Sequence, residues 1–144
     1  MLAKTGVIFV NKEEAEILVG DSTTVSDLLY RLHRLGPDIV VITDGPNGAF
    51  ASDGINQFFL PIFPLKVVER TGAGDAFATG FVAALYHGNT IKEALRWGAA
   101  NSASVVTKIG PEDGLLKLTE LRKMLQRFIK IKPTIHRNHD AKKK

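Results

Sequence analysis

The sequence predicts an α/β protein with three layers, α/β/α, in which a parallel sheet forms the core and a hairpin is added to it. Two short apolar runs, Val7–Val10 and Ile39–Ile42, are of the kind that forms parallel strands covered on both faces. The stretch between them has helical periodicity, so that strand, helix and strand make a right-handed βαβ unit. Further along, Asp53 and Gly54 separate two β-type runs, which predicts a hairpin with a tight turn.

Length and composition indicate one globular domain with a hydrophobic core. The chain has 144 residues, of which 44% are hydrophobic and 24% are charged, and we expect a single α/β domain over residues 1–132. It has no cysteine, which excludes disulfides and thiolate metal sites. No apolar run reaches the length of a membrane span, and the first residues do not resemble a signal peptide. We therefore expect no membrane contact and a cytoplasmic location.

The net charge of +4 is modest, and much of it lies near the C-terminus. Residues 133–144 are predicted to be a basic, disordered tail. None of the usual nucleic-acid-binding motifs is present, so we expect no nucleic-acid partner. Binding of nucleic acid through the basic tail is the weaker alternative.

A helix is predicted to begin directly after the first strand. Asn11 is a good N-cap residue, and acidic residues, among them Glu14, fill the first turn. One interpretation is a capped helix and nothing more. The other is that Asn11 and Glu14 converge at the end of a strand, where Glu14 holds a water ligand of Mg²⁺ beside the phosphates of a nucleotide.

A second helix is predicted to start at Thr24 or Ser26 and to stop at Gly36 and Pro37. Its leucines recur three and four residues apart, a spacing typical of a helix that packs one face on a core. His33 lies one residue from that apolar stripe, so we expect it at the surface.

The loop after the second strand is a candidate ligand-binding segment. Loops at the carboxyl ends of parallel strands are where α/β sheets bind ligands. Glycine, proline, asparagine and aspartate also make ordinary turns, so a plain turn is the alternative. The residues of this loop are Thr43, Asp44, Gly45, Pro46, Asn47 and Gly48.

The stretch Gly72-Ala73-Gly74-Asp75 carries the strongest chemical signal. It leads through small residues into a helix that we expect to end near Tyr86. Helix N-termini present unsatisfied N–H groups, and without Cβ atoms at Gly72 and Gly74 a phosphate can approach them. Asp75 can then accept the proton of an attacking hydroxyl, which suits phosphoryl transfer. The alternative is a turn in which Asp75 only favours the helix start.

Two more helices are predicted after that one. Thr90 and Glu93 form a capping box at the start of the first of them, and many small residues run along it. These small residues imply either close packing against another helix or a pocket for adenine. A final amphipathic helix extends from about Leu118 to Phe128.

The stretch over residues 70–81 closely resembles the C-terminal signature of the ribokinase-like (PfkB-type) carbohydrate kinases. It reads Arg-Thr-Gly-Ala-Gly-Asp-Ala-Phe-Ala-Thr-Gly-Phe. Other segments resemble this family in the expected order, from Val7 to about Phe128. The resemblance implies that the chain is the ATP-binding and catalytic C-terminal half of an enzyme that phosphorylates a hydroxyl group of a sugar.

The resemblance also implies roles for individual residues. The aspartate that matches Asp75 is the family's catalytic base, and the backbone that matches Gly72, Ala73 and Gly74 is its anion hole. ATP and Mg²⁺ are the implied cofactors, with K⁺ as a further expectation. The residues implied to bind the nucleotide, with Glu14 also holding Mg²⁺ through water, are Asn11, Glu14, Thr43, Asp44, Gly45, Pro46, Asn47, Gly48, Gly74 and Asn101. A monovalent cation site, formed mainly by backbone carbonyls, is implied at Glu69, Thr71, Val105, Lys108, Gly110 and Gly114.

The chain departs from the family pattern at two places that concern ligands. Glu69 stands where the family has an aspartate that helps to bind the monovalent cation. Ala99 stands where the family commonly has a polar residue in the helix that borders adenine, and Asn101 lies two residues later. The cation site and the adenine contact are therefore the least conventional parts of the predicted site.

Nothing in the 144 residues resembles the family's N-terminal half, which carries the early strands and the sugar-binding residues. The expected partners are ATP, a sugar or sugar phosphate, the missing N-terminal half or a partner chain, and a second copy in a homodimer. Two alternatives stay open. One is a fragment that binds nucleotide or pairs with a partner without catalysis, and the other is a nucleoside kinase of the same family.

Overall fold

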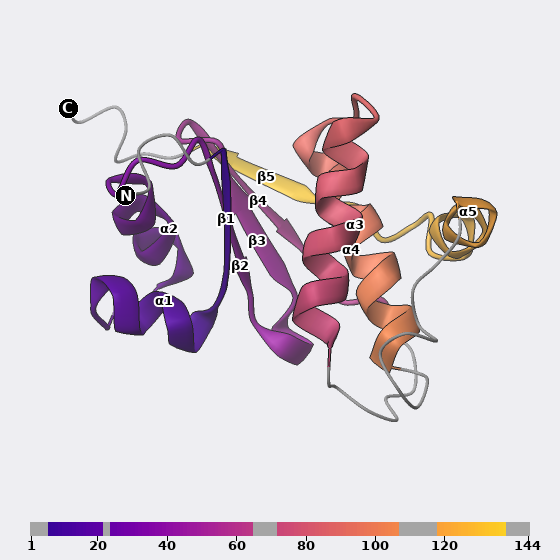
Figure 1. Cartoon of the computed structure of the whole chain (residues 1–144), viewed down its shortest axis with the longest axis horizontal. Helices are drawn as coiled ribbons and strands as arrows, with labels where there is room; N and C mark the ends of the chain where they lie inside the picture. The colour runs from indigo at the N-terminus through magenta and orange to yellow at the C-terminus, as the bar shows by residue number, and fades with distance from the viewer. Residues whose placement is uncertain (1–5, 22–23, 65–71, 107–117, 138–144) are drawn as a thin grey trace. The chain divides into compact units, whose positions relative to one another are not determined.

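A computed structural model describes residues 6–21, 24–64, 72–106 and 118–137 (Figure 1). The chain divides into two compact units, and the single domain predicted over residues 1–132 stays a prediction. Met1–Phe59 and Thr134–Lys144 form the first, which we call the sheet unit, and Leu60–Pro133 form the second, which we call the helical unit. No helix among the described residues is both long and apolar enough to cross a membrane.

The sheet has five strands in the order β1-β2-β3-β4-β5. Their bounds are β1 Val7–Asn11, β2 Ile39–Thr43, β3 Ala49–Ser52, β4 Asn56–Leu60 and β5 Thr134–Arg137. As predicted, β1 and β2 are parallel, with Val7 opposite Ile39 and Asn11 opposite Thr43. The pairs β2–β3 and β4–β5 are antiparallel. The fold class is therefore α/β, with a mixed sheet in which the parallel part is the β1–β2 pair.

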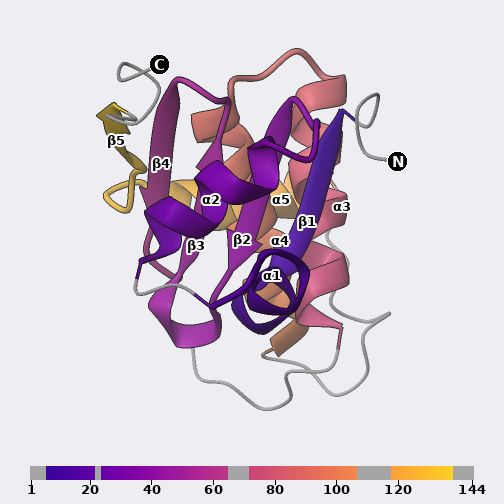
Figure 2. The ribbon, with the colours of Figure 1, turned by 90° about the vertical axis from the view of Figure 1, so that its left-hand side faces the viewer.

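Two helices, α1 (Lys12–Val19) and α2 (Val25–His33), lie on one side of the sheet, in front of the strands in Figure 2. α2 starts at the Thr24 cap, whose Oγ1 accepts a hydrogen bond of 3.1 Å from the Asp27 N–H. The predicted stripe of leucines is confirmed at Leu28, Leu29 and Leu32, which are buried, whereas Leu35, beyond the end of α2, is 42% exposed. The buried core residues here are Ala15, Leu28, Leu29, Leu32, Val40 and Ile42.

His33 is not the surface residue that the sequence predicted. Its side chain is partly buried at the end of α2. Nδ1 lies 3.2 Å from the carbonyl oxygen of Pro37, and Nε2 lies 3.0 Å from that of Ser52 in β3. A histidine beside an apolar stripe can thus reach backbone carbonyls from two segments, and helical spacing alone does not reveal those segments.

The hairpin between β3 and β4 is confirmed at the predicted turn. Gly54 has a φ of 93°, a left-handed conformation that favours glycine. The Asp53 carboxylate accepts hydrogen bonds from the N–H groups of Ile55 at 2.9 Å and Asn56 at 2.7 Å. This side-chain turn sets the direction of β4.

Part of the predicted disordered tail is a strand. Thr134–Arg137 form β5, which pairs antiparallel with β4, Phe58 lying opposite Ile135. Pairing with the open edge of β4 satisfies backbone groups in a segment whose sequence looks merely polar and basic. Residues 138–144, the rest of the predicted tail, lie outside the described residues.

The helical unit contains α3 (Ala73–Tyr86), α4 (Ile91–Val106) and α5 (Leu118–Arg127). α3 and α4 pack backbone to backbone through two glycines. A Cβ added at Gly80 would lie 2.6 Å from the carbonyl oxygen of Trp97, and one added at Gly98 would lie 2.9 Å from that of Phe77. Gly80 and Gly98 therefore serve close helix packing, the first of the two interpretations drawn from the sequence, while the adenine pocket stays a prediction.

We expect Gly80→Ala to destabilise the protein by about 1–3 kcal/mol relative to Gly74→Ala, the usual range for overpacking. Both changes replace a glycine of α3 and bring a comparable gain in helix propensity, so their difference isolates the clash. Gly74 is the matched control because no heavy atom lies within 4 Å of its added Cβ. Urea unfolding measures the free energy of each variant. Equal stability of the two would contradict the close approach at Trp97.

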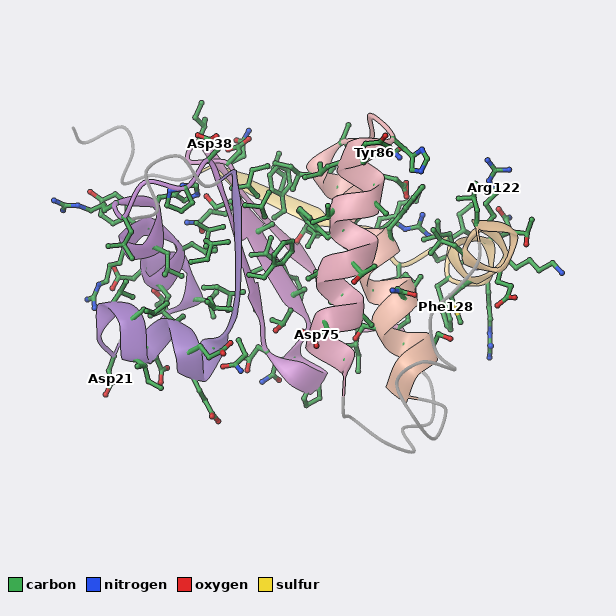
Figure 3. The ribbon with its side chains drawn as sticks, in the orientation of Figure 1. Asp21, Asp38, Asp75, Tyr86, Arg122 and Phe128 are labelled. Atoms are coloured by element: carbon green, nitrogen blue, oxygen red, sulfur yellow. The ribbon has the colours of Figure 1, made fainter. Side chains whose placement is uncertain are left out.

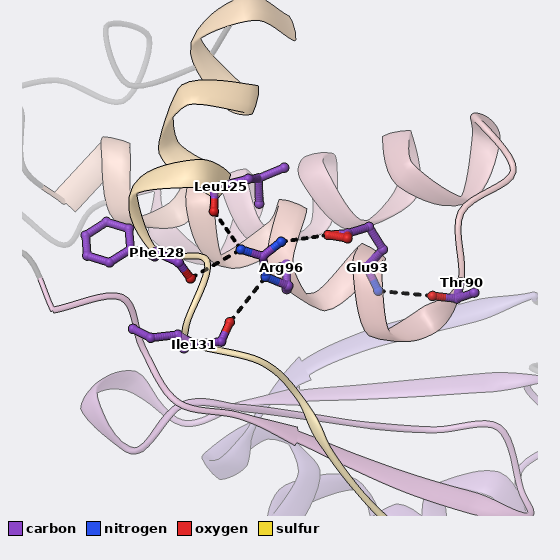
Figure 4. Close-up of polar contacts among 6 residues, drawn as sticks. All are labelled: Thr90, Glu93, Arg96, Leu125, Phe128 and Ile131. Carbon is purple, nitrogen blue, oxygen red and sulfur yellow. Dashed lines mark hydrogen bonds and ion pairs between the residues drawn. The ribbon is translucent and has the colours of Figure 1, made fainter.

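Arg96 of α4 forms hydrogen bonds to the end of α5 and to the segment that follows it (Figure 4). Its Nη2 donates to the carbonyl oxygens of Leu125 at 2.7 Å and Phe128 at 3.2 Å, and its Nε donates to that of Ile131 at 3.2 Å. Its Nη1 donates to the Glu93 carboxylate at 2.9 Å. One guanidinium group thus bonds a carbonyl of the last turn of α5 and two carbonyls of the segment that follows it.

The start of α4 has one half of the predicted capping box. Thr90 Oγ1 accepts a hydrogen bond of 3.2 Å from the N–H of Glu93, as predicted. The Glu93 carboxylate, which the box would turn back toward Thr90, forms its ion pair with Arg96 instead. A guanidinium group three residues along the same helix competes for that carboxylate.

Candidate active site

The predicted anion cradle is the start of α3. Gly72 is the N-cap residue, with a φ of 84°, and α3 begins at Ala73. The helix closes its first turn with a hydrogen bond of 2.9 Å from the N–H of Ala76 to the Gly72 carbonyl. In such a turn the preceding N–H groups have no helical partners and carry the positive end of the helix dipole. The backbone of Gly72, Ala73 and Gly74 therefore has the arrangement that binds an anion.

Gly74 leaves this turn open. Gly74 is exposed, and among the described residues no heavy atom beyond its chain neighbours and its own helix backbone lies within 4 Å of the position that a Cβ would occupy. A side chain here would not collide with its own helical unit, but it would fill the space from which an anion approaches the N–H groups. Packing among the described residues therefore gives no reason for a glycine at this position.

Asp75 lies in the first turn of α3, as predicted, and its side chain is exposed. Figure 3 shows it at the beginning of the helix, at the opposite end from Tyr86. Within the described part of the helical unit, no residue donates a hydrogen bond to its carboxylate. Its backbone carbonyl accepts a bond of 2.9 Å from Thr79 Oγ1. A carboxylate in this position is able to accept a proton beside a bound anion.

Asn101 reaches the same turn from α4. It is 6% exposed, and its Nδ2 donates a hydrogen bond of 2.8 Å to the carbonyl oxygen of Ala76. The amide that the sequence assigned to nucleotide binding is thus bonded to the residue that follows Asp75. Sequence reasoning missed this contact because Asn101 is 25 residues away from Ala76 along the chain.

Asn11 and Glu14 form a reciprocal capping box at the start of α1. The Asn11 side chain accepts from the N–H of Glu14, and the Glu14 carboxylate accepts from the N–H of Asn11, both at 2.8 Å. The capped-helix interpretation is therefore confirmed. The bond to the Asn11 N–H leaves the Glu14 carboxylate with further acceptor positions, because a carboxylate has two oxygens. The residue is also exposed. A single exposed carboxylate also suits Mg²⁺, which keeps several waters and takes other ligands from phosphates.

The parallel strands bring two of the predicted segments to one edge of the sheet. Asn11, the last residue of β1, is the register partner of Thr43, the last residue of β2. The loop that follows Thr43 contains the short helix η1 (Gly45–Asn47) and closes with a bond of 2.9 Å from the Asp44 N–H to the Gly48 carbonyl. The capped start of α1 and this loop thus meet at the carboxyl edge, where α/β sheets bind ligands.

The loop also carries conformations that need glycine. Gly45 has a φ of 50° and Gly48 one of 99°. The Asn47 side-chain amide donates to the Asp44 carboxylate at 3.3 Å, and Gly48 is buried while its neighbours in η1 are exposed. Both the plain-turn and the ligand-binding interpretations of this loop agree with that geometry.

The predicted monovalent cation site falls largely on residues that the structure does not describe. Glu69, Thr71, Lys108, Gly110 and Gly114 lie outside the described residues, as does the side chain of Val105. The cation site stays a prediction. The other predicted residues form two groups, one at the carboxyl edge in the sheet unit and one at the start of α3 in the helical unit.

Known proteins are similar to this chain in both sequence and fold. Residues 1–118 match the family model described as pfkB family carbohydrate kinase. The chain is 37% identical over 112 residues to the cytidine kinase of Thermococcus kodakarensis, an alignment that covers 76% of this chain and 40% of that protein.

Two solved structures resemble the chain closely. One is the ribokinase of Arabidopsis thaliana, complexed with ribose and ATP, with a TM-score of 0.79, 26% identity and coverage of 86% of this chain and 42% of that one. The other, from E. coli, is provisionally named ribokinase II and is in complex with ATP and Mg²⁺; its TM-score is 0.74 and its identity 28%, covering 85% of this chain and 40% of that one. The chain thus spans about two fifths of the length of these relatives.

Proposed function

Because this chain belongs to the pfkB family of carbohydrate kinases, we propose that it is the ATP-binding and catalytic part of a kinase that phosphorylates a hydroxyl group of a carbohydrate. The observation that carries the proposal is the start of α3. There an open backbone turn at Gly74 adjoins the exposed carboxylate of Asp75. Phosphoryl transfer to an alcohol requires these two elements together, a binding place for the transferring group and a base beside it.

In the proposed reaction the hydroxyl oxygen of the substrate forms a bond to the γ-phosphorus of ATP, and the bond from that phosphorus to the bridging oxygen breaks. ADP leaves with the electron pair, and the hydroxyl proton passes to Asp75. The N–H groups at the start of α3 stabilise the negative charge on the transferring oxygens. A single donor of this kind contributes about 2.7–4 kcal/mol in measured cases.

The sheet unit would hold the nucleotide from its carboxyl edge. The loop from Thr43 to Gly48 would lie along the phosphates and ribose, and Glu14 would hold a water ligand of Mg²⁺. The metal, when bound, supplies charge neutralisation for the phosphate oxygens. The E. coli relative in complex with ATP and Mg²⁺ supports this assignment. K⁺ at the predicted cation site would be a further ligand.

We expect Glu14→Gln to separate the two roles of this residue. Glutamine can keep the capping-box bond to the Asn11 N–H, so the free energy of unfolding should change by less than about 0.5 kcal/mol. The loss of charge should lower the affinity for Mg·ATP more than the affinity for metal-free ATP. Calorimetric titrations with and without Mg²⁺ measure both affinities. An equal change in the two, or none, would leave Glu14 as a helix cap only.

The acceptor is either a sugar, a sugar phosphate or a nucleoside. The relatives include a ribokinase complexed with ribose and a cytidine kinase, so both acceptor classes occur among proteins similar to this chain. We favour a carbohydrate because the matching family is one of carbohydrate kinases. A screen of both classes, in an active assembly that contains this chain, would identify the acceptor.

The first test is a calorimetric titration of ATP and ADP, with Mg²⁺ and K⁺, into the chain as it stands. We expect saturable binding of both nucleotides. If the chain unfolds cooperatively and yet binds neither, then it does not carry a working nucleotide site by itself. That result would favour a fragment without catalytic competence over the proposed kinase half.

A second candidate function is pairing with a partner chain, and one observation favours it. β1 is bonded to β2 along one edge, and no described strand pairs with its other edge. Its residues Val7–Val10 are apolar and only partly buried. Such an edge offers backbone groups to a further strand, which a partner chain or a second copy would supply. Light scattering of the purified chain would show association if this edge is used, and a monomer at high concentration would contradict self-pairing.

A further inference from the structure

Asn101 is a buried polar residue in the packed contact between α3 and α4. It is 6% exposed and donates from Nδ2 to the Ala76 carbonyl oxygen at 2.8 Å. A buried amide of this kind is well satisfied, and its removal would disturb the contact. Its hydrogen-bond partner suggests a role at the candidate active site, because Ala76 is the residue next to Asp75.

Both backbone polar groups of Ala76 form hydrogen bonds. Its N–H donates to the Gly72 carbonyl at 2.9 Å, which closes the first turn of α3, and its carbonyl accepts from Asn101. A bond at this carbonyl therefore restrains the turn that contains Gly74 and Asp75. The same bond ties the turn to α4, a helix of 16 residues.

The close backbone approach makes this bond geometrically possible. Gly98 lies one helical turn before Asn101, and a Cβ there would lie 2.9 Å from the Phe77 carbonyl oxygen. Because the two backbones touch here, the short asparagine side chain spans the remaining distance to a carbonyl of the opposite helix. Gly98 and Asn101 of α4 thus contact consecutive residues of α3: Gly98 lies against Phe77, and Asn101 bonds to Ala76.

We propose that Asn101 is a positioning residue, which holds the turn Gly72–Asp75 in place through the Ala76 carbonyl instead of contacting the nucleotide. The consequence for ATP rests on the proposed kinase function, whereas the restraint on the turn does not. The chain offers a matched comparison. Asn89 donates from its own Nδ2 to the carbonyl of Ala84 at 3.2 Å, near the other end of the same helix.

The test compares Asn101→Leu with Asn89→Leu, each of which removes one amide bond to a carbonyl of α3. Hydrogen exchange of the Ala76 N–H reports on the first turn, and that of the His87 N–H, which bonds to Ala83, reports on the last. We expect Asn101→Leu to speed exchange at Ala76 by about tenfold and to leave His87 within about twofold. Asn89→Leu should speed exchange at His87 and leave Ala76 within about twofold. Equal acceleration at both ends would indicate general destabilisation and would overturn the proposal.

The affinity for Mg·ATP is measured in parallel by calorimetry. We expect Asn101→Leu to weaken it by about tenfold and Asn89→Leu to leave it within about twofold. If the unmodified chain binds no ATP, the proposed function fails, while the exchange at Ala76 still decides the role of Asn101. If Asn101→Leu does not fold, Asn101→Ala replaces it, with Asn89→Ala as its partner. Faster exchange at Ala76 with unchanged ATP affinity would support the restraint on the turn and overturn its consequence for ATP.

Discussion

Asp75→Asn is expected to abolish phosphoryl transfer in an active assembly that contains this chain, while ATP binding persists. The amide has nearly the same shape as the carboxylate, so the start of α3 should keep its structure, but it cannot accept the hydroxyl proton. Loss of a positioned general base lowers the rate by about 10²- to 10⁴-fold. A coupled assay for ADP release measures the rate, and calorimetry measures ATP affinity, which should stay within a few-fold because the backbone N–H groups remain.

The matched control for this change is Asp38→Asn. Asp38 is also exposed, and it directly precedes β2, at the end of the strand opposite to Thr43 (Figure 3). It should leave both the rate and the affinity unchanged. Turnover of the Asp75 variant within a few-fold of the unmodified enzyme would remove Asp75 from the proposed mechanism.

Gly74→Val is expected to remove nucleotide binding without unfolding the chain. Among the described residues no heavy atom is found within 4 Å of a Cβ added at Gly74, so we expect the valine side chain to be tolerated there. It does occupy the approach to the N–H groups at the start of α3, where a phosphate would bind. Loss of even two hydrogen bonds to a charged group corresponds to a fall in affinity of about 100-fold or more. Calorimetry with ATP and ADP would then detect no saturable binding.

Gly6→Val provides the matched control for a glycine in open space. Gly6 likewise has no heavy atom of the described residues within 4 Å of its added Cβ, and it precedes β1 at the end far from Asn11. We expect this variant to bind ATP as the unmodified chain does. Binding of ATP by the Gly74 variant at unchanged affinity would mean that the phosphates do not approach this turn.

Sequence reasoning succeeded where neighbouring residues decide the structure. The cap at Asn11 and Glu14, the cap at Thr24 and the turn at Asp53 and Gly54 were each confirmed at the predicted residues. Each of these features is closed by hydrogen bonds between residues two or three apart. The residue types there are preferred for local reasons that the chain carries in any context.

It failed where a distant segment supplies the partner. His33 was placed at the surface because helical spacing does not show that Ser52 lies within reach. Thr134–Arg137 were placed in a disordered tail because the open edge of β4, about 75 residues earlier, is not visible in the local pattern. The same limit hid the bond from Asn101 to Ala76.

The sequence by itself determined the α/β class, the order and caps of the main elements, and the family to which the chain belongs. Its short motifs also named Gly74 and Asp75 as the residues of interest, because a helix start with glycines has chemical meaning wherever it occurs. Only the tertiary structure decided that the sheet is mixed, that Asn11 lies beside Thr43, and that Asn101 turns to α3. Those outcomes depend on which surfaces and edges pair across long stretches of chain, and such pairing depends on shape and unsatisfied backbone groups rather than on local residue preference.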